Sequence, residues 1–171
     1  MAFTIGETVV HPNYGAGIIT DIREHEFLDV EKKPYYSIQL LGSPETTVMV
    51  AVQNEQEAGL RPTVSQSRLS RVWRILSSKP EQLPTDHNKR YDALKEKLYS
   101  GNVLRIAEVL RDLTWRNEQR RKWTTRGKRL YDRGMQLLAG EVAGSRHWDV
   151  DAAQDRISRA LDQGIASSQA I

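Results

Sequence analysis

The pattern of hydrophobic residues changes near residue 63, and this change constrains the fold more than any other feature of the chain. Before it, short β-branched and aromatic runs alternate with glycine and proline, which is typical of strands and turns. After it, apolar residues recur every three or four positions, which is typical of amphipathic helices. A chain of 171 residues is long enough for two small domains. We therefore predict an α+β protein, with a β-rich domain over 1–62 and a helical domain over 63–171.

The N-terminal part contains four strand-like segments separated by turn residues. The segments cover residues 8–10, 17–22, 35–40 and 46–52. Pro12, Gly15 and the Gly42-Ser43-Pro44 run supply the turns. Four or five short strands within about 60 residues indicate a small, strongly bent sheet or barrel. Gly15-Ala16-Gly17 is no dinucleotide-binding motif, because the third glycine is missing and no helix follows.

We expect an all-helical bundle of about five helices after residue 63. Thr85 or Asp86 is suited to cap the second of these helices, and Thr124 or Thr125 the fourth. The apolar faces are formed by Leu69, Val72, Trp73 and Leu76; by Tyr91, Leu94 and Leu98; by Val103, Ile106, Ala107, Leu110 and Leu113; by Leu130, Leu137, Leu138 and Val142; and by Ile157, Ala160 and Leu161.

The two parts carry opposite charge. Residues 1–62 hold four basic and nine acidic side chains, for a net charge of −5. Residues 63–171 hold 21 basic and 13 acidic side chains, for a net charge of +8. Such asymmetry indicates two modules with different partners, of which only the helical one attracts phosphate. A solvated helical surface that happens to be basic is the simpler alternative.

Several function classes find no support in the sequence. The absence of cysteine excludes disulfides and thiolate chemistry. The four histidines are scattered, and no phosphate-binding loop, nucleophile elbow or paired-acid motif is present, so we expect neither an enzyme nor a metal or other cofactor. No secretory signal and no apolar run of about 18 residues is visible, so we expect a cytoplasmic protein without membrane contact.

The strongest concentration of positive charge lies in residues 102–133. This segment holds ten basic side chains against four acidic ones, together with Trp115, Trp123 and Tyr131. Arg120-Arg121-Lys122-Trp123 falls where one helix ends and the next begins, which is a suitable phosphate site. We predict that Arg111 is structural, because Asp112 adjoins it, and that Trp73 and Trp115 are core residues.

Short motifs in both halves resemble one known family in wording and in order. The matching segments are Phe3-x-Ile5-Gly6-x-x-Val9-Val10-x-Pro12-x-x-Gly15, Val48-x-Val50 before Gly59-Leu60-Arg61, Lys89-Arg90-Tyr91, Glu96-Lys97-Leu98-x-Ser100-Gly101, Ile106-Ala107-Glu108-Val109-Leu110-Arg111-Asp112-Leu113, Lys128-Arg129 and Leu138-x-Gly140-Glu141. Over residues 3–143 the chain resembles the CarD/CdnL-type bacterial transcription regulators.

The resemblance implies a fold and a mechanism. Family members have an N-terminal Tudor-like module that binds the RNA polymerase β subunit, largely by pairing at a strand edge. Their helical domain contacts promoter DNA near the upstream edge of the −10 element and stabilises the open complex. A wedge aromatic, typically tryptophan, enters the minor groove there. We accordingly expect a transcription regulator whose partners are the polymerase β subunit and promoter DNA, associated with the nucleoid through polymerase.

Three positions depart from the family pattern. His87 aligns with the wedge tryptophan, and it is either a working wedge or an exposed histidine in a helix cap. Met49 and His25 stand where arginines contact polymerase, with Arg23 close by as a substitute. The polymerase-binding residues that the resemblance implies are Arg23, His25, Thr47, Val48, Met49 and Val50.

The predicted DNA-binding residues combine the resemblance with the basic segment. Lys89, Arg90, Lys128 and Arg129 match basic positions of the family, and Trp123 is the candidate for a replacement wedge. The full set is His87, Asn88, Lys89, Arg90, Arg121, Lys122, Trp123, Lys128 and Arg129.

Two other functions compatible with the sequence differ in what the helical domain binds. In one, the chain is a divergent paralogue whose β domain docks on polymerase or another protein while the helical domain binds a protein and no DNA. In the other, it is a freestanding, non-specific DNA-binding protein. We expect a monomer without a small-molecule substrate.

Overall fold

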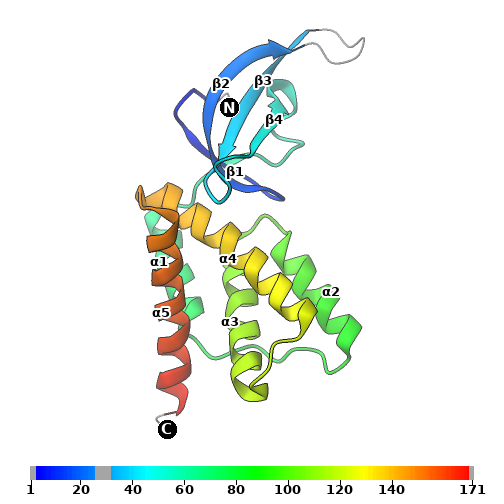
Figure 1. Ribbon diagram of the computed structural model, residues 1–171, viewed down its shortest axis with the longest axis vertical. Coiled ribbons are helices and arrows are strands. Elements are labelled where there is room, and N and C mark those ends of the chain that lie inside the picture. The colour runs from blue at the N-terminus through cyan, green and yellow to red at the C-terminus, as the bar shows by residue number, and fades with distance from the viewer. Residues whose placement is uncertain (1–2, 26–31, 170–171) are drawn as a thin grey trace.

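Five antiparallel strands form one sheet in the N-terminal part of the computed structural model, which describes residues 3–25 and 32–169 (Figure 1). The strands are β1 (Thr8–His11), β2 (Gly15–His25), β3 (Lys33–Leu40), β4 (Thr47–Ala51) and β5 (Arg61–Pro62), and a single 3-10 turn, η1 (Val52–Asn54), follows β4. Their order is β4-β3-β2-β1-β5, so the sheet is open and β4 and β5 are its edges. The predicted bent sheet is confirmed, whereas the four predicted segments did not include β5.

The bend of the sheet is produced along β2. Its pairing with β3 shifts between Ile19 and Asp21, which is the mark of a bulge that increases local twist. Close approach of the two strands requires Gly17, because a Cβ there would lie 2.7 Å from the carbonyl oxygen of Gln39. The curved inner face buries a small core of Val9, Ile19, Tyr36, Ile38, Val50 and Leu60.

Five helices follow the sheet. They are α1 (Gln66–Leu76), α2 (His87–Leu98), α3 (Val103–Arg120), α4 (Thr125–Arg146) and α5 (Val150–Gln169). Asp86 caps α2 by accepting a bond from the Lys89 amide, and Thr124 caps α4 by accepting one from the Gly127 amide. Among the described helices, none is long and apolar enough to cross a bilayer.

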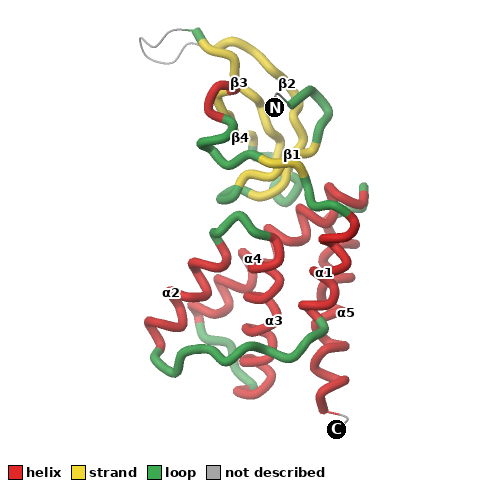
Figure 2. Tube along the Cα trace, turned by 180° about the vertical axis from the view of Figure 1, so that it is seen from behind, coloured by secondary structure: helices red, strands yellow, loops and turns green. Residues whose placement is uncertain are grey.

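The predicted apolar faces meet in one core of the helical part. Leu76, Leu98, Leu110, Leu138 and Ile157, one from each helix, are completely buried in it. α3 and α4 pack against each other at its centre, and α5 covers the side next to α1 (Figure 2). Trp73 and Tyr91 are half-buried at its edge. The helical periodicity of the sequence therefore gave the correct faces.

The sheet rests on the C-terminal half of α4, through β1 and β2 (Figures 1 and 2). Small residues on α4 allow this contact. A Cβ at Gly144 would lie 2.7 Å from the methyl carbon of Thr8, and Gly140 lies directly beneath Ala16. β2 reaches the same helix where Gly15 contacts the Leu137 side chain.

One ion pair joins the end of the sheet to the helices. Arg61 of β5 donates from Nη1 and Nη2 to the two carboxylate oxygens of Glu141 on α4, at 2.6 and 2.9 Å. Its Nε donates to the carbonyl oxygen of Gly101, between α2 and α3. The carboxylate also accepts a bond from the Val64 amide, in the linker to α1. Four segments therefore meet at one pair of charges.

We predict that Arg61→Ala destabilises the protein by about 3–5 kcal/mol, because it leaves the completely buried Glu141 carboxylate without its partner. The free energy of unfolding in urea measures this. Arg105→Ala is the matched control, since Arg105 is exposed and Lys97 still pairs with Glu108 after its loss, so this change should cost less than about 1 kcal/mol. Equal effects of the two changes would show that the Arg61–Glu141 pair has no special role.

Candidate nucleic-acid interface

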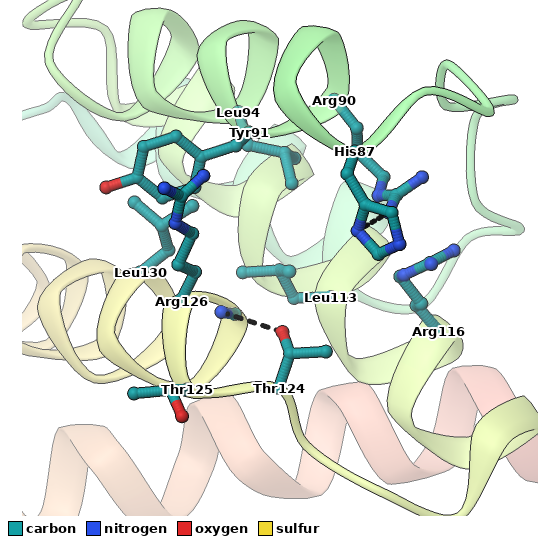
Figure 3. Close-up of a pocket in the computed structure, with 11 residues that line it drawn as sticks. His87, Arg90, Tyr91, Leu94, Leu113, Arg116, Thr124, Thr125, Arg126 and Leu130 are labelled. Atoms are coloured by element: carbon teal, nitrogen blue, oxygen red, sulfur yellow. Dashed lines mark hydrogen bonds between the residues drawn. The ribbon is translucent and has the colours of Figure 1, made fainter.

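The residues predicted to bind DNA lie where α2 and α4 begin and α3 ends. Figure 3 shows two of them, His87 and Arg90. His87, Asn88 and Lys89 form the first turn of α2, and all three are exposed. Lys128 and Arg129 are exposed in the first turns of α4. α2 and α4 begin far from the sheet, because it is the later parts of these helices, around Gly101 and Gly140, that approach it. This surface thus faces away from the β part.

A bond between the helices brings the two basic segments together. Arg126 of α4 donates to the Asn88 side chain of α2 at 3.4 Å, and its guanidinium lies 5.0 Å from the centre of the Tyr91 ring. This contact places Asn88 and Arg126 on one surface, although they are 38 positions apart in the sequence. Arg126 was absent from the predicted residues.

Arg90 differs from the other basic residues, because it is buried. Its Nη1 donates to the carbonyl oxygens of Pro84 and Thr85, at 2.9 and 3.0 Å, and its Nη2 lies 2.9 Å from Nδ1 of His87. The side chain therefore fixes the segment before α2 and the orientation of His87. We assign Arg90 a positioning role in place of the predicted direct DNA contact.

The loop between α3 and α4 carries the remaining predicted residues. Arg121 is the C-cap of α3, with a left-handed backbone (φ 54°), and it is exposed together with Lys122. Trp123 is half-buried, and the centre of its ring lies 4.9 Å from the centre of the Tyr131 ring. Lys128 lies over both rings. The Trp123 ring is therefore less available as a wedge than the exposed His87.

A pocket of about 270 Å³ opens at the centre of this surface, between α2, α3 and α4 (Figure 3). Arginines and a histidine line it together with apolar side chains and the two threonines that begin α4. The lining residues are His87, Arg90, Tyr91, Leu94, Leu113, Arg116, Thr124, Thr125, Arg126, Gly127 and Leu130. No carboxylate is among them. The sequence did not reveal this pocket, because it is built from three helices. His87 and Arg90 were predicted to bind DNA and Thr124 or Thr125 to cap a helix, but Arg116 and Arg126 were not predicted as site residues.

Arg111 and the two tryptophans predicted as core residues differ in burial, and of the two tryptophans Trp73 is the one that packs against the helical core. Arg111 is buried and donates to Asp112 at 2.8 Å and to Ser78 at 3.0 Å, which confirms its predicted structural role. Trp73 and Trp115 are half-buried. Burial raises the pKa of the Asp112 carboxyl, and the bond from Arg111 opposes this shift.

The residues predicted to bind polymerase occupy the edge strand β4 and the C-terminal end of β2, and β3 lies between these two strands. Thr47 and Met49 on β4 are exposed, Val48 is half-buried, and Val50 is buried in the sheet core. Arg23 on β2 pairs with Asp21 at 2.6 Å, and the His25 ring contacts that of Tyr35. In the described sheet one edge of β4 has no neighbouring strand, so its backbone is open to pairing.

The fold and the charged surface together define a two-part binding protein, with an open sheet edge at one end and a basic helical surface at the other. Residues 3–64 match the family described as "CarD-like/TRCF RID domain", and residues 71–158 match "CarD, C-terminal domain". The chain is 31% identical over 140 residues to the Bacillus subtilis (strain 168) protein named "Putative transcription factor YdeB". That alignment covers 82% of this chain and 90% of the relative. The protein belongs to the CarD family of transcription factors.

Family membership confirms the resemblance noted in the sequence and has two functional consequences. The protein has a role as a transcription regulator, and its RID domain implies interaction with RNA polymerase. Neither match identifies the residues at either interface.

Proposed function

We propose that the protein joins the RNA polymerase β subunit to promoter DNA and stabilises the open complex. In this proposal the β4 edge docks on polymerase, and the start of α2 and of α4 contacts DNA near the upstream edge of the −10 element. The observation that carries it is the exposed basic surface around His87, Lys128 and Arg129, which lies away from the acidic sheet.

The charges on this surface suit phosphate contacts. Lys89, Lys128 and Arg129 are exposed, so their charged groups lie at the solvent surface. Lys128 pairs with the exposed Asp132 one turn further along α4, and a phosphate would replace that partner. Such contacts release counterions and position a protein on the duplex without reading its sequence. His87 projects from the first turn of α2 within this surface, where the family wedge would be. An exposed ring there stabilises opened DNA only if it binds that state better than the closed duplex.

The β4 edge suits a docking role by strand addition. An added strand pairs with exposed backbone groups, and alternate side chains give specificity. Met49 is 38% exposed on β4, so it presents an apolar surface where the family has a charged one. We therefore propose a docking contact that has the same backbone geometry as in other family members but a different side-chain chemistry.

We predict that Lys128→Ala/Arg129→Ala weakens binding to fork-junction DNA and reduces the salt slope of the binding constant by about two, because two phosphate contacts are lost. Fluorescence anisotropy across a salt series measures both quantities. Arg156→Ala/Arg159→Ala is the matched control, since it removes two exposed arginines from α5. If the first variant binds fork DNA as wild type does, the DNA surface is misplaced, and the reading in which the helices bind a protein gains support.

We predict that His87→Trp lengthens the lifetime of the open promoter complex and His87→Ala shortens it, because a larger ring fills more of an unstacked step. The lifetime is measured with polymerase after addition of a competitor, with and without the protein. Asp92→Ala is a control on the same helix at an exposed position. Equal lifetimes with alanine, histidine and tryptophan would exclude a wedge at this position.

We predict that Met49→Glu lowers the affinity for the polymerase β subunit at least tenfold, whereas Met49→Leu changes it less than twofold, because only the first replaces an apolar contact by a charge. Surface-immobilised polymerase and the full chain provide the measurement. If Met49→Glu binds as tightly as wild type, β4 is not the docking edge, and the freestanding DNA-binding function becomes the better proposal.

A further inference from the structure

The pocket between α2, α3 and α4 has walls of two chemical kinds. Leu113 forms its floor, and the side chains of Leu94 and Leu130 add to the apolar lining (Figure 3). Tyr91 and Arg126 stand on one side of this floor, and His87 and Arg116 stand on the other. A flat group that enters would therefore have an aromatic ring, an imidazole and two guanidinium planes within reach.

The arginines of the pocket have no carboxylate beside them in the lining. Three arginines line the pocket, at 90, 116 and 126, and among the described residues no aspartate or glutamate does. Arg116 is the least satisfied of them, because its Nη2 is buried and has no hydrogen-bond partner in the part of the chain that the structure describes. Burial lowers the pKa of Arg116, and the positive charges of Arg90 and Arg120 lower it further. The pocket therefore has room for an anion, and it has positive charge that no carboxylate in its lining balances.

The start of α4 adds to this preference. Thr124 caps the helix at the mouth of the pocket, and the first amides of a helix favour negative charge. A ligand that suits both the apolar and the cationic lining of the pocket is a planar, weakly polar ring joined to an anion. A nucleotide unit has this combination, since bases stack on aromatic and guanidinium planes and phosphate pairs with arginine.

We propose that this pocket takes one unstacked nucleotide of an opened DNA strand, with the base between the Tyr91 and His87 sides and the phosphate on Arg116 and Arg126. This inference rests on the proposed function. A nucleotide within a strand is favoured over a free one, because Lys89, Lys128 and Arg129 are exposed in the first turns of the two helices whose starts line the pocket and would hold neighbouring phosphates. The pocket then stabilises opened DNA by holding a base that only the opened state releases.

Two fork-junction DNAs that differ in one group test the proposal with the full chain. In one the first unpaired nucleotide carries adenine, and in the other it is abasic. We expect wild type to bind the first about tenfold more tightly, the size of a base–aromatic stack. Thr125→Trp fills the pocket from an exposed position at its rim and should abolish this preference, so that the variant binds the two DNAs equally.

Ser70→Trp adds the same ring at an exposed position on α1 and should keep the tenfold preference. A Thr125→Trp variant that retains the preference would place the base elsewhere and overturn the inference. Equal binding of the two DNAs by wild type would overturn it and leave the proposed DNA contact intact. Failure of wild type to bind either DNA would refute both the pocket inference and the proposed DNA contact. Micromolar binding of 5′-dAMP, unaffected by fork DNA, would show a free-nucleotide site and refute the strand-bound form.

Discussion

The bidentate pair between Arg61 and Glu141 is the contact on which the arrangement of the two parts depends. The carboxylate is almost completely buried, so it is tolerable in the structure only with Arg61 and the Val64 amide bonded to it. Its position fixes β5 against α4, and the Arg61–Gly101 bond extends this constraint to the segment between α2 and α3. Gly140 and Gly144 complete the contact, because any larger residue at 144 would hold the sheet away from α4.

This arrangement has a functional consequence for a CarD-family transcription factor. α4 carries the sheet on its C-terminal half and the basic surface on its first turns, so one helix of 22 residues links the two proposed partners. An α-helix is a stiff connection of about 1.5 Å per residue. If polymerase binds at β4 and DNA near Lys128, as proposed, the helix and the Arg61–Glu141 contact set the distance and direction between them.

The candidate site was only partly predictable. Lys128, Arg129 and Lys89 were found from local charge and family motifs, and the structure leaves them exposed as a phosphate contact requires. Arg90 has the same sequence signature, yet it is buried by the Pro84–Thr85 segment, which comes back over the helix start. Arg116 and Arg126 were missed because neither is close in sequence to the α2 residues with which it lines the pocket.

The sequence by itself determined the elements and their faces, because hydrophobic periodicity and capping residues such as Asp86 and Thr124 act within one or two turns of the chain. It also determined the opposite charges of the two parts. Tertiary structure alone decided which edge of the sheet stays open, which arginine is buried, and that three helices enclose a cationic pocket. These features depend on contacts such as Asn88–Arg126 and Arg61–Glu141, which join residues 38 and 80 positions apart and leave no local pattern in the sequence.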